Sequence, residues 1–173
     1  MVEAVGWGAL AASSLVVGAL IGLARSWPPR AVGRVLGFGA GALISAVSFE
    51  LAGEGVRIAG AAPVAVGLAV GAVTYYAAAG RVAALGGGAA LVLGAFLDGI
   101  PEQLVLGIGL AGGEAVSIGL LAAIYVSNLP EAIGGAADMR RSGRAQGRTL
   151  AVWLAIATAC ALATGAGFAL ADA

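Results

Sequence analysis

Six long apolar runs constrain this chain more than any other feature. They cover about residues 6–24, 35–53, 62–79, 85–110, 115–137 and 149–170. Most are close to the roughly 20 residues that an α-helix needs to cross the hydrocarbon core of a bilayer. Lipid offers no hydrogen bonds to a peptide backbone, so such runs cross it as helices. The sequence therefore predicts an all-α, polytopic transmembrane helix bundle of about six spans, forming a single transmembrane domain over residues 1–173.

The composition agrees with a membrane protein and excludes a soluble domain. Hydrophobic residues make up 61% of the chain and charged residues 10%, whereas soluble domains carry about 25% charged residues. The formal net charge is zero, so no nucleic-acid partner is expected. Cys160 is the only cysteine and lies in an apolar run, so we interpret it as a small core residue.

The 30 glycines suit membrane helices, because small residues allow helix backbones to approach closely. Pairs with the spacing Gly-x-x-x-Gly occur at positions 18/22, 37/41 and 67/71. Packing within the chain is the interpretation that we favour for these pairs, and a homodimer is the alternative.

Arginines set the expected orientation. All nine basic residues are arginines, and eight of them fall in alternate breaks between the runs: Arg25, Arg30, Arg34, Arg81, Arg140, Arg141, Arg144 and Arg148. Alternate loops share one side of a membrane, and loops rich in arginine stay in the cytoplasm. The breaks around Arg57 and Glu114 belong to the other side. We therefore expect a multi-pass protein of the cell (plasma or inner) membrane, in contact with the lipid bilayer, with its N-terminus outside.

Two similar acidic motifs lie inside apolar runs. Residues 98–102 read Asp-Gly-Ile-Pro-Glu, and residues 127–131 read Ser-Asn-Leu-Pro-Glu. A charged residue inside a span is costly, which makes it a candidate functional residue. The spacing from Asp98 to Glu102, and from Asn128 to Glu131, places each pair on one helix face. Each proline also lacks an N–H and leaves a backbone carbonyl one turn earlier without its helical donor.

These motifs bring together side chains with oxygen atoms, and the predicted metal ligands are Asp98, Glu102, Ser127, Asn128 and Glu131. Three carboxylates at low dielectric repel one another unless they are protonated or neutralised by a cation. No basic residue lies within the predicted spans, so we favour a bound metal cation. The alternative is that protonated carboxylates only bridge the helices. Glu50, near the outer end of the second run, is either an entrance ligand or an interfacial residue.

At these motifs the sequence resembles the ZIP family of divalent metal transporters. Bacterial ZIP proteins carry His-Asn-Phe-Pro-Glu-Gly in the fourth helix and Gln-Asn-Ile-Pro-Glu-Gly in the fifth, which correspond to residues 98–103 and 127–132 here. The glycine-rich stretch 37–43 is similar to the second helix of that family. The resemblance also implies a metal site between the fourth and fifth helices and an extracytoplasmic N-terminus.

Several positions depart from the family pattern. Asp98 replaces the histidine, Gly99 the asparagine, Gln103 the final glycine, and Ser127 the leading residue of the second motif. The sixth run carries no acid, and Gly99 cannot ligate, so the resemblance implies one bound metal rather than two. ZIP proteins usually have eight helices, whereas this chain shows six. The resemblance therefore implies either that the last two helices are missing from this chain or that it is a shortened or inactive relative.

We therefore expect a transporter of a divalent metal cation (zinc, manganese or iron), and not an enzyme. The metal is the substrate, and no cofactor is expected. An oxygen-only ligand set suits manganese or ferrous iron, although zinc binds most such sites more tightly than manganese does. Two alternatives remain: a proton-coupled transporter of another solute, and a non-transporting ZIP-like membrane protein with a degenerate site.

Overall fold

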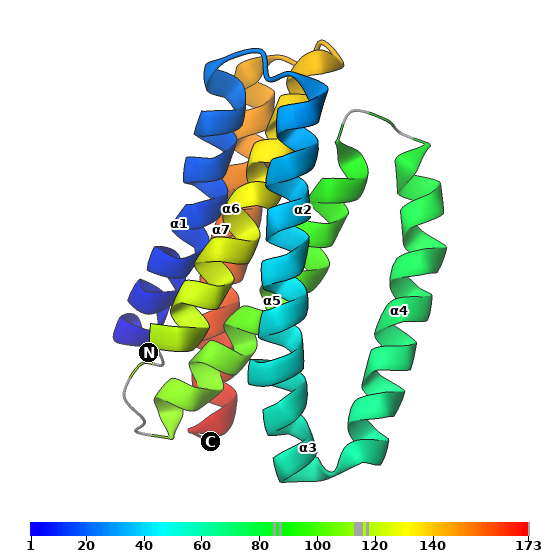
Figure 1. Ribbon diagram of the computed structural model, residues 1–173. Coiled ribbons are helices and arrows are strands. Elements are labelled where there is room, and N and C mark those ends of the chain that lie inside the picture. Colours follow the sequence, from blue (N-terminus) through cyan, green and yellow to red (C-terminus); the bar gives the residue numbers. More distant parts are fainter. Residues whose placement is uncertain (85, 87, 113–115, 117, 173) are drawn as a thin grey trace.

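The computed structural model describes residues 1–84, 86, 88–112, 116 and 118–172, apart from the side chains of Glu50, Glu54 and Ala83. Within that part, the chain forms seven α-helices and one π-helical segment, η1 (Figure 1). In chain order these are α1 (Val2–Ala24), α2 (Pro29–Ala46), η1 (Val47–Ala52), α3 (Gly53–Ala59), α4 (Ala61–Ala83), α5 (Ala89–Ala111), α6 (Ile118–Arg141) and α7 (Gln146–Ala171).

Six of these helices are long and apolar enough to cross a membrane: α1, α2 with the start of η1, α4, α5, α6 and α7. The predicted all-α polytopic bundle is confirmed, and the chain is a multi-pass membrane protein in its architecture. Figure 1 shows α1, α2, α5, α6 and α7 running side by side, with α4 standing apart from them.

Several predicted helix ends need correction. The second helix begins at Pro29 rather than at residue 35, because proline has its φ preset for the first helical position and needs no donor there. The fourth spanning helix begins at Ala89 rather than at 85, after Gly88 with φ of 74°. The described part of the fifth spanning helix starts at Ile118, and residue 115, where we placed its start, lies outside the described residues. Glu114, which we placed in the loop before it, lies outside the described residues.

The second helix also continues beyond its predicted end. The π-helical segment η1 includes a bond from the Gly53 N–H to the Ser48 carbonyl, and α3 extends the helix to Ala59. An apolar run predicts a spanning helix but does not distinguish an α-turn from a π-turn, so the sequence did not reveal η1. The candidate entrance residue Glu50 lies in this segment, and its side chain is outside the description.

The helices α1, α5, α6 and α7 form a tightly packed block, in which α1 contacts α6 and α7, and α5 contacts α7, extensively. A Cβ added at Gly18 or at Gly22 would lie 2.6 Å from a backbone oxygen of α6. Leu15, Trp153 and Cys160 are fully buried in the core of the block. The Gly18/Gly22 pair therefore serves packing within the chain, and the prediction of Cys160 as a core residue is confirmed.

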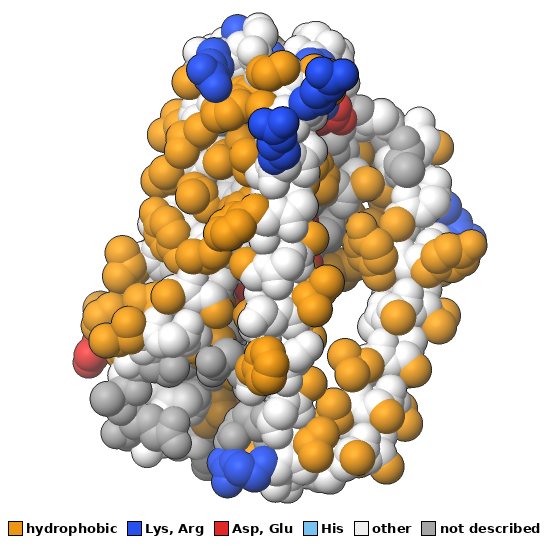
Figure 2. All heavy atoms as spheres, viewed as in Figure 1, with side chains coloured by type: hydrophobic (Ala, Val, Ile, Leu, Met, Phe, Trp, Pro, Cys, Tyr) orange, Lys and Arg blue, Asp and Glu red, His pale blue; other side chains and the backbone are white. Residues whose placement is uncertain are grey.

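By contrast, α4 has no buried residue among those described, and it contacts mainly α3 and α5. Figure 2 shows open space between α4 and the rest of the chain. A Cβ added at any glycine of the pairs 37/41 and 67/71 would meet no atom within 4 Å. These two pairs do not pack within the chain, and the homodimer stays a prediction.

Candidate functional site

Both Pro-Glu motifs lie inside neighbouring spanning helices. Pro101 is inside α5 and Pro130 is inside α6. The two helices run antiparallel: a Cβ added at Gly88 would lie 2.6 Å from the Gly135 carbonyl oxygen, and one added at Gly94 would lie 2.5 Å from Oε1 of Glu131. The sequence therefore placed the motifs correctly on two helices that contact each other.

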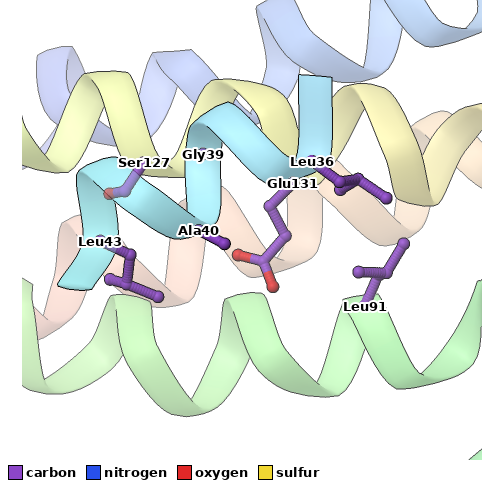
Figure 3. Close-up of a pocket in the computed structure, with 7 residues that line it drawn as sticks. All are labelled: Leu36, Gly39, Ala40, Leu43, Leu91, Ser127 and Glu131. Atoms are coloured by element: carbon purple, nitrogen blue, oxygen red, sulfur yellow. The ribbon is translucent and has the colours of Figure 1, made fainter. Parts of the chain in front are cut away.

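A cavity of about 220 Å³ opens between α2, α5 and α6. It is lined by Leu36, Gly39, Ala40, Leu43, Leu91, Ser127 and Glu131. Figure 3 shows the Glu131 carboxylate extending from α6 into the space between α2 and α5, with leucine side chains on either side. Two of the five predicted ligands, Ser127 and Glu131, thus share one largely apolar cavity.

The contribution of α2 to this cavity was missing from the residue-level predictions. A Cβ added at Gly39 would lie 2.6 Å from the Cβ of Pro130, so α2 packs directly against the proline of the second motif. Gly39 and Ala40 leave room beside Glu131 because both are small. The glycine-rich stretch 37–43 was the signal in the sequence, although it did not identify which residues face the cavity.

Glu102 and Asn128 lie deeper in the helix block. Their exposed fractions are 4% and 2%, and neither Oε2 of Glu102 nor Nδ2 of Asn128 has a hydrogen-bond partner among the described residues. A buried polar atom without a partner costs about 1–3 kcal/mol, so native structures rarely keep one without a ligand or water. A carboxylate oxygen accepts a cation or a proton, and rotating the Asn128 amide presents its oxygen instead of its nitrogen.

The three predicted carboxylate ligands are not grouped closely enough to hold one ion together. Among the described residues, no group of three or more Asp, Glu, Cys or His side chains is arranged to hold a metal ion. Asp98 is half-buried, and its charge and that of Glu102 lie within electrostatic range of Glu131. The Ser127 hydroxyl donates to the Ile124 carbonyl at 3.1 Å, so only its lone pairs are free. One ion held by all three carboxylates would need them to move closer, and that site stays a prediction.

Gln103, a departure from the ZIP motif, has a structural position that the sequence did not reveal. Its side chain is fully buried, its amide donates to the Gly8 carbonyl at 3.3 Å, and its Oε1 accepts from the Thr164 hydroxyl. Because α5 is thereby joined to α1 and α7, these bonds fix the helix that carries Asp98 and Glu102.

Gly99, the second departure, also has a packing reason. A Cβ added there would lie 2.8 Å from Sγ of Cys160. A larger side chain at this position, such as the asparagine of the ZIP motif, would therefore require the Cys160 side chain to move.

In comparisons with known proteins, no family model matches the chain, and no curated protein matches it. The fold and the site therefore define a class only: a multi-pass α-helical membrane protein with carboxylates buried at the contact between two spanning helices. The resemblance to ZIP transporters stays a prediction.

Proposed function

We propose that the chain moves a divalent metal cation across the membrane, using the carboxylates of α5 and α6 as its oxygen ligands. The observation that carries this proposal is the position of Glu131, whose carboxylate enters a largely apolar cavity between spanning helices. No basic residue lies in α5, and the arginines of α6 lie only in its last turn. A mobile cation is therefore the simplest partner for a charge that would be costly alone.

Glu102 supports the same proposal from the other side of the helix contact. Its Oε2 is buried without a partner, and Asp98 lies one turn from it on the same helix face. Gly94, which packs against Glu131, lies one turn before Asp98 in α5. An ion leaving the Glu131 cavity would therefore meet Asp98 and then Glu102 along one stripe of α5. We propose that transport involves this sequence of carboxylates, with one ion bound at a time.

The positions of the arginines indicate the orientation of the protein in the membrane. The loops between α1 and α2 and between α6 and α7, together with the adjoining helix turns, carry seven of the nine, and we place them in the cytoplasm by the positive-inside rule. The protein would then sit in the cell membrane with its N-terminus outside. Because the proposed ligands are all oxygen atoms, manganese and ferrous iron are the transported ions that suit the site best. Zinc would compete by binding tightly.

Metal uptake into proteoliposomes tests the proposal. The wild-type protein should accumulate Mn²⁺, Fe²⁺ or Zn²⁺ down a gradient, and the Glu131→Gln and Glu102→Gln variants should each lose at least about tenfold of that flux, because an amide carries no charge to hold the ion. Glu3→Gln is the matched control, since Glu3 is exposed in the first turn of α1. Equal flux in all four proteins would refute the proposal.

A proton-coupled transporter of another solute is the second candidate. It is favoured by the absence of a three-ligand metal arrangement among the described residues, because a single carboxylate is enough to carry a proton. Thermal unfolding of the purified protein separates the two functions. A metal present at 100 times its dissociation constant stabilises the folded state by about 2.7 kcal/mol. If no divalent ion gives any stabilisation while a pH gradient is dissipated, proton coupling is the better account.

A further inference from the structure

Two loops that are far apart in the sequence meet at one end of the bundle. The loop between α1 and α2 lies beside the loop between α6 and α7 (Figure 1). The Arg140 guanidinium, in the last turn of α6, donates a hydrogen bond to the Leu23 carbonyl, in the last turn of α1. This bond satisfies a carbonyl at the negative end of a helix dipole with a positive charge, and it holds the two loops together.

The two loops and the adjoining helix turns carry six exposed arginines, which we call the arginine surface: Arg25, Arg30, Arg34, Arg141, Arg144 and Arg148. Figure 2 shows several basic side chains gathered at this end of the molecule. Among residues 24–34 and 138–149, all of which the structure describes, Asp138 is the only acid. It forms an ion pair with Arg141 at 2.9 Å. The chain thus leaves a large excess of positive charge there.

Trp27 indicates the depth of this surface in the membrane. Its indole N–H donates to the Ile21 carbonyl at 3.0 Å, and the Arg25 guanidinium lies 4.3 Å from the centre of its ring. Tryptophans at the ends of spanning helices lie at the level of the lipid headgroups. A guanidinium stacked on such a ring is therefore within reach of lipid phosphates.

The chemistry of the surface matches phosphate. The planar guanidinium forms two parallel hydrogen bonds to a phosphate, whereas a lysine offers a point charge. Every basic residue of this chain is an arginine. Arg30 and Arg34 lie one turn apart on α2, and Arg144 and Arg148 are likewise four residues apart where α7 begins. Orientation during membrane insertion needs positive loops, but it does not need the two loops to meet in the folded protein.

We propose that the arginine surface binds the phosphates of anionic phospholipids, such as phosphatidylglycerol, from the leaflet at that end of the protein. Basic clusters directly beside spanning helices attract anionic lipids strongly. The interaction gives the arginine surface negative charge, of which the chain itself supplies only that of Asp138 there.

Native mass spectrometry of the purified protein tests this inference. The protein is mixed with equal amounts of phosphatidylglycerol and phosphatidylcholine, and the bound lipids are counted. The wild-type protein should retain phosphatidylglycerol preferentially, and the preference should fall when ionic strength rises from about 0.05 M to about 0.5 M. Each double variant, Arg30→Gln/Arg34→Gln and Arg144→Gln/Arg148→Gln, should lose about tenfold of the preference.

The matched control is Arg57→Gln/Arg81→Gln, which removes the same charge outside the arginine surface and should keep the preference. A wild-type protein that binds both lipids equally, or double variants that retain the full preference, would overturn the inference, and the wild-type result does not depend on whether a variant folds. Inorganic phosphate at the same concentration should not displace the lipid. If it does, the surface binds free phosphate and the assignment to lipid is wrong.

Discussion

The contact between α5 and α7 gives the sharpest test of the packing that holds α5, the helix that carries Asp98 and Glu102, in place. A Cβ added at Gly107 would lie 2.0 Å from the Thr164 carbonyl oxygen and 2.8 Å from the Phe168 nitrogen. Ordinary contact begins at 3.4 Å, so Gly107→Ala requires the two helices to separate by about 3.4 − 2.0 = 1.4 Å. Both atoms belong to backbone and cannot rotate away.

Such overpacking costs about 1–3 kcal/mol, and the better helix propensity of alanine offsets about 0.5–1 kcal/mol. We therefore expect Gly107→Ala to lower the free energy of unfolding by about 1 kcal/mol, and by at most about 2.5 kcal/mol. Gly109→Ala is the matched control two residues along the same helix, because a Cβ there would meet nothing within 4 Å. It should be neutral or slightly stabilising.

Cys160 provides the assay. It is the only cysteine and is fully buried, so a thiol-reactive fluorophore labels it only when the block of helices opens. The midpoint of labelling on heating should be lower in Gly107→Ala than in the wild type, and unchanged or higher in Gly109→Ala. If Gly107→Ala matches or exceeds Gly109→Ala, α5 and α7 do not approach as closely as described.

Three further predictions concern the site and the topology. Asp98→His should shift selectivity toward zinc, because it introduces a nitrogen ligand; an unchanged zinc-to-manganese ratio in a competition assay would remove Asp98 from the ligand set. Gln103→Leu should lower the midpoint of Cys160 labelling, because the Gly8 carbonyl and the Thr164 hydroxyl lose their partner at a cost of about 1–3 kcal/mol; an unchanged midpoint would show that these bonds add nothing. In a Cys160→Ala background, an impermeant reagent added to whole cells should label a cysteine at Val2 and not one at Ser142; the reverse pattern would invert the orientation.

The sequence was sufficient for the spanning helices, because each apolar run has the length that a bilayer requires. It was also sufficient to place Glu102 and Glu131 on two consecutive spanning helices, and the structure shows that these two helices contact each other. The helix start at Pro29 was missed because hydropathy falls near arginines even where the backbone is already helical. The start at Ala89 was placed too early because the glycines before it continue the apolar run, although Gly88 has a φ of 74° and is not helical.

The details of the candidate site could not be predicted, because they depend on how the helices pack in space. No sequence pattern shows that Gly39 packs on Pro130, or that Gln103 bonds to Gly8 and Thr164, because these contacts join helices that are distant in the chain. The separation of Glu131, in the cavity, from Glu102, in the helix block, was also hidden. Spacing places residues on one face of a helix but does not show which neighbour that face meets.

The isolation of α4 has a consequence for the response to bilayer thickness. With 23 residues, α4 is about 34 Å long, slightly more than the roughly 30 Å hydrocarbon core. A helix that exceeds the bilayer tilts to relieve hydrophobic mismatch. The tilts of α1, α5, α6 and α7 are fixed by their mutual packing, whereas α4 is joined to its neighbours mainly at its ends. A thinner membrane would therefore change the tilt of α4 first, and the strain would reach the cavity through Gly60 and α3 on one side and the start of α5 on the other.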